Sequence, residues 1–139
     1  MLRAVLDVNV LVSALLRQDG TPANVLRAWE NGLYEVVASP GLLHELERVL
    51  SRPHIARNIA PDTAADLLAG VRQNAILIDD PPPERHVPSD PDDDYLVALA
   101  LAAGAHAIVT GDTALLALDL NRPRILTPRD FLTAHERIE

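Results

Sequence analysis

Apolar residues in this chain fall into short blocks that alternate between two kinds of spacing. Leu2–Leu6 is an almost unbroken apolar run, which predicts a strand buried on both faces. Further strands are predicted at Tyr34–Ala38, Ala75–Ile78, Ala107–Val109 and Arg124–Leu126. The segments between these strands carry helical spacing, so the pattern predicts strands alternating with helices.

The predicted helices begin at recognisable signals. Thr21 and Ser39 are expected to be N-caps, because each precedes a proline suited to a first helical turn. Asp93–Ala103 is apolar on every side, which predicts a buried helix. The proline-rich segment Asp79–Pro91 is expected to be a loop. The remaining helices are predicted near residues 10–16, 61–71, 113–118 and after Thr127. This order predicts an α/β fold, a three-layer α/β/α sandwich with a central five-stranded parallel sheet.

Length and composition set broad limits on this fold. With 139 residues we expect one domain, residues 1–139. No apolar run approaches the ~20 residues of a membrane span. Met1 leads almost directly into a strand, so we expect no signal peptide. Cysteine is absent, which excludes disulfides and zinc–thiolate sites and agrees with an expected cytoplasmic location.

The charged residues narrow the function classes. All 12 basic residues are arginine, and without lysine the chain has no P-loop and lacks the late lysine typical of receiver domains. The net charge of −8 argues against a non-specific nucleic-acid coat. Seven acids against one arginine gather between Asp79 and Asp94, however, so the rest of the chain is nearly balanced. An arginine-lined groove is therefore compatible with the composition.

Four acidic residues stand at the edges of apolar segments. Asp7 and Asp112 follow two predicted strands, Asp94 opens a predicted helix, and Glu45 lies within another helix. In parallel sheets, ligands bind at the carboxyl ends of the strands, where Asp7 and Asp112 are expected. If the four acids converge, a set of carboxylates without histidine or cysteine indicates a hard cation, Mg²⁺ or Mn²⁺.

Each acid also has a simpler interpretation. Asp7 and Asp112 are suited to helix caps. Asp94 suits the macrodipole of a first helical turn, and Asp92 or Asp93 is an alternative to it. The periodicity of the helix after Ser39 does not choose between Glu45 and Glu47.

Four segments together resemble the PIN-domain family, and most closely the ribonuclease toxins of bacterial type II toxin–antitoxin systems (VapC-like). They are Leu6–Ala14, Ser39–Leu50, Asp90–Ala100 and Val109–Asp112. The resemblance selects Glu45 over Glu47. It also implies a strand order of 3-2-1-4-5, in which strands 1 and 4 are adjacent.

The resemblance implies a metal-dependent endoribonuclease. Asp7, Glu45, Asp94 and Asp112 would hold one or two Mg²⁺ or Mn²⁺ ions, and Asn9, Thr110 and Asp92 would support those ligands. Candidates for contacts with the RNA backbone are Arg17, Arg48, Arg52 and Arg57. A cognate antitoxin and a homodimer are also implied. The alternative is a non-catalytic PIN-like or receiver-like module that binds metal or phosphate.

Overall fold

The computed structural model describes the backbone of residues 1–82 and 91–138 and the side chains of residues 1–82 and 94–134. Strands and helices alternate along most of this chain. The strands are β1 (Arg3–Leu6), β2 (Glu35–Ala38), β3 (Ile76–Leu77), β4 (Ala107–Val109) and β5 (Arg124–Leu126). The helices are α1 (Val8–Leu16), α2 (Thr21–Glu30), α3 (Pro40–Leu50), α4 (Pro53–Ala56), α5 (Pro61–Asn74), α6 (Pro91–Ala103), α7 (Thr113–Leu116) and α8 (Pro128–Ile138).

The five strands form one parallel sheet in the order β3-β2-β1-β4-β5. This confirms the predicted fold class and the predicted adjacency of the first and fourth strands. In the central pair, Leu6 lies opposite Val109 and Ala4 opposite Ala107. The residues that follow β1 and β4 therefore emerge beside each other at the carboxyl edge of the sheet.

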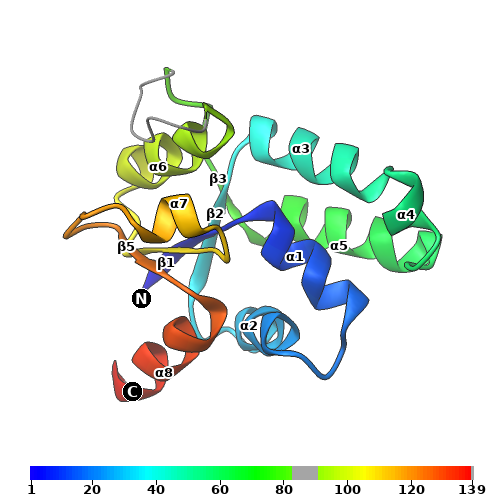
Figure 1. The fold of residues 1–139 in the computed structure, drawn as a ribbon, viewed down its shortest axis with the longest axis horizontal. Helices are drawn as coiled ribbons and strands as arrows, with labels where there is room; N and C mark the ends of the chain where they lie inside the picture. The colour runs from blue at the N-terminus through cyan, green and yellow to red at the C-terminus, as the bar shows by residue number, and fades with distance from the viewer. Residues whose placement is uncertain (83–90, 139) are drawn as a thin grey trace.

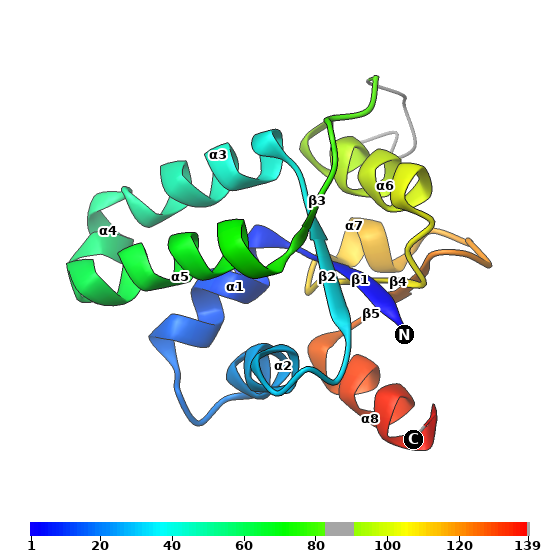
Figure 2. The same ribbon diagram turned by 180° about the vertical axis from the view of Figure 1, so that it is seen from behind.

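Helices cover both faces of this sheet. Figures 1 and 2 show α6 on one side and α2 and α8 on the other, while α3 and α5 run side by side. The three central strands β1, β2 and β4 are largely buried because helices pack on both faces: Val5, Val37 and Ile108 have no exposed surface. A buried aromatic pair joins the residue just before β2 to α8, where the rings of Tyr34 and Phe131 meet edge to face with centroids 4.9 Å apart.

Several predicted boundaries were wrong for local reasons. Gly20, not Thr21, is the N-cap of α2, and no side-chain cap bond forms there. Ser39 does cap α3 as predicted, accepting a hydrogen bond from the Leu42 amide over 3.2 Å. The single turn of α4 was missed because its four residues show no apolar period. Strand β2 begins at Glu35, one residue after the predicted start at Tyr34.

The helix predicted to be buried on every side is exposed along one part. In α6 the residues Leu96–Ala100 are buried, but Leu101 is 47% exposed. The helix packs on β1, β2 and β4, whereas Ala98, Leu101 and Ala102 line a pocket together with Pro81 and Pro82. Of the predicted loop Asp79–Pro91, residues 83–90 lie outside the described chain. No helix in the described ranges is long and apolar enough to span a membrane.

Candidate active site at the carboxyl edge of the sheet

Asp7 and Thr110 are the first residues after the paired ends of β1 and β4. The Asp7 amide continues the ladder by donating to the Val109 carbonyl over 2.9 Å. The Thr110 hydroxyl then donates to Asp7 Oδ2 over 2.8 Å, and both side chains are buried. Asp7 Oδ1 accepts the amide of Asn9 at 3.0 Å and so caps α1. The carboxylate is thus held in one orientation from two sides.

Asp112 is fixed by the same threonine. Its amide donates to Thr110 Oγ1 over 3.0 Å, so the Thr110 hydroxyl touches both acidic residues. Asp112 Oδ1 accepts the amides of Ala114 at 2.8 Å and Leu115 at 3.3 Å, which caps α7. Both aspartates are therefore helix caps, as the simpler interpretation predicted. Capping is compatible with a ligand role, because an ionised carboxylate offers about four acceptor positions.

Glu45 projects from α3 and is engaged by an arginine one turn later. Arg48 Nη2 donates to Glu45 Oε1 over 2.6 Å and Arg48 Nε donates to Oε2 over 2.9 Å, a two-pronged contact. The hydrogen bond from Arg48 lowers the pKa of the Glu45 carboxyl below its ordinary value, and the charges of Arg48 and Arg52 add to this effect. Glu45 is therefore held as an anion by a cation of its own chain.

These residues share one small pocket of about 180 Å³. Its wall includes three of the four predicted acids together with two arginines of α3 and the segment after it. The lining residues are Asp7, Val8, Asn9, Glu45, Arg48, Val49, Arg52, Tyr95, Leu96 and Asp112. The arrangement combines anionic and cationic groups in one recess, a set of groups suited to a phosphate ester together with a cation.

The remaining predicted site residues are placed less centrally. Asp94 is half-buried and precedes the pocket residue Tyr95, but it does not itself line the pocket. The side chain of Asp92 lies outside the described ones. Arg17 and Arg57 are exposed and do not line the pocket, and Arg57 Nε donates to the Pro53 carbonyl over 3.2 Å.

Two features of the site were not predicted. Tyr95 and Leu96 form part of its wall. They were missed because the sequence of α6 indicated only an apolar, buried helix. The contact between Glu45 and Arg48 was also missed, although a spacing of three residues on a helix is a readable signal for an ion pair.

A divalent cation is compatible with this donor set only in part. Asp7 and Asp112 supply the oxygen donors that Mg²⁺ and Mn²⁺ favour. Both oxygens of Glu45, however, face Arg48. Within the described residues, no three histidine, aspartate or glutamate side chains are grouped so that they could hold a metal ion together. Glu45 can act as a ligand only when its hydrogen bonds with Arg48 are broken.

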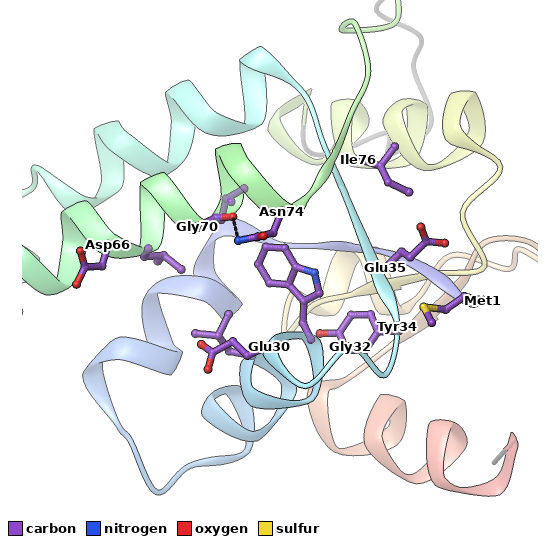
Figure 3. A pocket seen from close by; sticks show the side chains of 13 residues that line it. Met1, Glu30, Gly32, Tyr34, Glu35, Asp66, Gly70, Asn74 and Ile76 are labelled. Carbon is purple, nitrogen blue, oxygen red and sulfur yellow. Dashed lines mark hydrogen bonds between the residues drawn. The ribbon is translucent and has the colours of Figure 1, made fainter.

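A larger pocket of about 500 Å³ lies elsewhere, between α2, β2 and α5 (Figure 3). Met1, Glu35 and Ile76 line it, and these residues precede or open strands, so the pocket lies toward the amino ends of the sheet. Figure 3 also shows Asn74 bonded to the Gly70 carbonyl, a contact of 3.0 Å within α5. None of the predicted site residues lines this pocket, and the chemistry of the smaller one is the more specific.

Comparison with known proteins identifies the family of this chain. No curated protein matches the chain significantly. Among solved structures, it is similar to the PIN domain of human SMG5, with 14% sequence identity, a TM-score of 0.49 and 99% of each chain covered. The family model described as "PIN domain" matches residues 3–114, most of the chain. By this match, which includes β1, α3, α6 and β4, the chain belongs to the PIN domain family.

Proposed function

We propose that this protein is a metal-dependent endoribonuclease that hydrolyses RNA phosphodiester bonds. The observation that carries the proposal is the link between Asp7 and Asp112 through the Thr110 hydroxyl, since both acids line a pocket together with Glu45. Membership of the PIN domain family supports a nuclease. The sequence resemblance to VapC-like toxins supports RNA as the substrate.

The residues of the pocket would have three roles: binding the metal, orienting its ligands and binding the RNA. Asp7 and Asp112, with Glu45 when Arg48 releases it, would hold Mg²⁺ or Mn²⁺, and Asp94 remains a candidate ligand from α6. When bound, the ion activates water and polarises the phosphate. Thr110 fixes the orientation of Asp7 by its hydrogen bond of 2.8 Å. Arg48 and Arg52 place positive charge where an RNA backbone would enter.

The biological role that we propose is that of the toxin in a toxin–antitoxin pair. A cognate antitoxin would then cover the pocket or a groove beside it, and the toxin would form a two-fold dimer. Support for these partners comes from the sequence resemblance alone. Light scattering of the purified chain tests the dimer, and a monomer at high concentration would refute it.

A non-catalytic binding module is the second candidate. Two observations favour it: Arg48 donates to both oxygens of Glu45, and the described acids form no three-membered metal group. In that case the two aspartates would serve as helix caps and nothing more.

Asp7→Asn separates the two candidates. Asparagine caps helices about as well as aspartate, so the fold should persist in either case. A nuclease should lose Mn²⁺-dependent RNA cleavage entirely, because the charge that holds the cation is gone. Cleavage of a short RNA and melting temperature without metal should be measured for wild type and variant. Full activity in the folded variant would refute the nuclease assignment of Asp7.

A further inference from the structure

The contact between Arg48 and Glu45 differs from the other ion pairs of the described chain. Arg3 approaches Glu35 at 3.7 Å and Arg72 approaches Glu47 at 3.6 Å, both at exposed positions. Arg48 instead makes two hydrogen bonds of 2.6 and 2.9 Å to a carboxylate that lines a pocket. Two-pronged charged contacts of this kind are stronger and more directional than single ones.

Arg52 offers an internal comparison. It lines the same pocket and lies four residues after Arg48, just before α4, but no hydrogen bond or ion pair joins its side chain to a described residue. Its charge acts on Glu45 only through space, as a secondary cause of the lowered pKa of that carboxyl. The two arginines therefore bring the same charge to one pocket, and only one of them occupies the oxygens of Glu45.

On the basis of the proposed function, we propose that Arg48 and a divalent cation compete for Glu45, and that Arg48, once displaced, binds the phosphate backbone of the RNA. Both parts follow from the position of the guanidinium. It satisfies the two oxygens that a cation would need, and 56% of its side chain is exposed, so it can turn toward the pocket without unpacking the core. A guanidinium that leaves a carboxylate finds in a phosphate an acceptor of the same forked geometry.

Competition of this kind gives Arg48 two effects of opposite sign. Removing it should strengthen metal binding, because Glu45 becomes available and a repelling charge is lost. The same change should weaken RNA binding, because a phosphate contact is lost. A residue that merely stabilises the site would weaken both. Arg48 is in this sense a positioning residue for the ligand Glu45 and a binding residue for RNA.

The test compares Arg48→Met with Arg52→Met. Each variant removes one positive charge from the pocket, and only Arg48→Met frees the oxygens of Glu45. Calorimetric titration with Mn²⁺ in the absence of RNA should show about fivefold tighter binding for Arg48→Met and little change for Arg52→Met. In cleavage assays at saturating Mn²⁺, the KM for RNA should rise about tenfold in both variants, with a smaller effect on kcat.

Two results would overturn the proposal. One is an Mn²⁺ affinity of Arg48→Met equal to that of wild type. The other is equal tightening in Arg52→Met, which would reduce the effect to net charge. If Arg48→Met does not fold, Arg48→Lys is tested in its place, because lysine keeps the positive charge but cannot make the bidentate contact of a guanidinium. Its Mn²⁺ affinity should then exceed that of wild type, and an unchanged value again refutes the competition.

Asp7→Asn in the same titration keeps this proposal separate from the proposed function. If wild type binds Mn²⁺ and Asp7→Asn does not, the metal site is supported. If the Mn²⁺ affinity of Arg48→Met then equals that of wild type, only the role of Arg48 is refuted. If wild type and Asp7→Asn both fail to bind Mn²⁺, or bind it equally, the proposed metal-dependent function fails first, and the competition fails with it.

Discussion

The Thr110 hydroxyl lies 2.8 Å from Asp7 Oδ2, although the two residues are 103 positions apart in the chain. The parallel register brings them together, because Leu6 and Val109 are partners in the sheet and the next residues follow at the same edge. The same hydroxyl accepts the Asp112 amide at 3.0 Å. One buried side chain thus orients one acid and the backbone of another.

Thr110→Val should separate this hydrogen bonding from packing. Valine has nearly the same shape, so the core stays filled, but the buried acceptor Asp7 Oδ2 loses its donor. We expect a loss of about 1–3 kcal/mol in the free energy of unfolding and a fall in cleavage of about 10-fold or more. Urea denaturation and a cleavage assay measure these effects. Thr110→Ser keeps the hydroxyl and should retain most activity, and an inactive Thr110→Ser would contradict this explanation.

The sequence was sufficient to predict the parallel sheet and the edge at which Asp7 and Asp112 lie. The runs that became β1 and β4 are apolar except for Arg3, so the residues after them could be placed at one edge before any register was known. Asp7 and Asp112 were predicted at that edge, and the family resemblance added Glu45 and Asp94 to the same site. The structure places Asp7, Glu45 and Asp112 around one pocket, and Asp94 does not line it. Their assignment as metal ligands stays a prediction.

What could not be predicted depends on side-chain direction. Periodicity placed Asp94 in the first part of α6 but did not decide whether it points into the pocket, and the pocket wall is formed instead by Tyr95 and Leu96. The exposed side of α6 was missed for a similar reason. Its sequence is apolar all round, whereas burial depends on which neighbours cover it.

Asp112 is predicted to combine a structural and a chemical role, which two substitutions can distinguish. Asp112→Ala removes the cap of α7 and should cost about 1 kcal/mol of stability. Asp112→Asn keeps an oxygen that can accept the Ala114 amide, so its melting temperature should stay near that of wild type. Both variants should lose Mn²⁺-dependent cleavage. An active Asp112→Asn would leave this residue with the capping role alone.

Ionised Glu45 is expected to stabilise the folded protein, and this stabilisation is lost at acid pH. Its pKa is lowered from the ordinary value of 4.5 by the hydrogen bond from Arg48, so the folded state favours the ionised form. This contribution is present above the unfolded pKa and is lost as pH falls through the lower folded pKa. The pair is partly exposed, with 34% and 56% of the two side chains accessible, so its net contribution stays below about 1 kcal/mol.

Glu45→Gln is the variant that isolates this effect. The stability difference between wild type and Glu45→Gln, from urea midpoints, should favour wild type near pH 7 and shrink toward pH 3. A difference that does not change with pH would show that the charge of Glu45 contributes nothing through Arg48.

Tyr34 gives a stability contribution that is lost at the opposite end of the pH range. Its hydroxyl donates to the Val25 carbonyl over 2.8 Å, its ring packs against Phe131, and only 1% of it is exposed. Burial raises the pKa of this phenol above its ordinary value. Above about pH 10 the unfolded chain can therefore ionise Tyr34 while the folded chain cannot, which draws the equilibrium toward unfolding.

Tyr34→Phe should accordingly cost stability at neutral pH and restore it in alkali. At pH 7 the loss of the hydrogen bond should lower the free energy of unfolding by about 1 kcal/mol. Each pH unit above 10 lowers the free energy of unfolding of wild type by up to about 1.4 kcal/mol through Tyr34, an effect that Tyr34→Phe lacks. The stability advantage of wild type over Tyr34→Phe should therefore vanish near pH 11. Denaturation curves of both proteins between pH 7 and 11 measure the gap, with Tyr95→Phe as the half-buried control. A gap that stays constant across this range would mean that Tyr34 ionises as readily in the folded protein as in the unfolded chain.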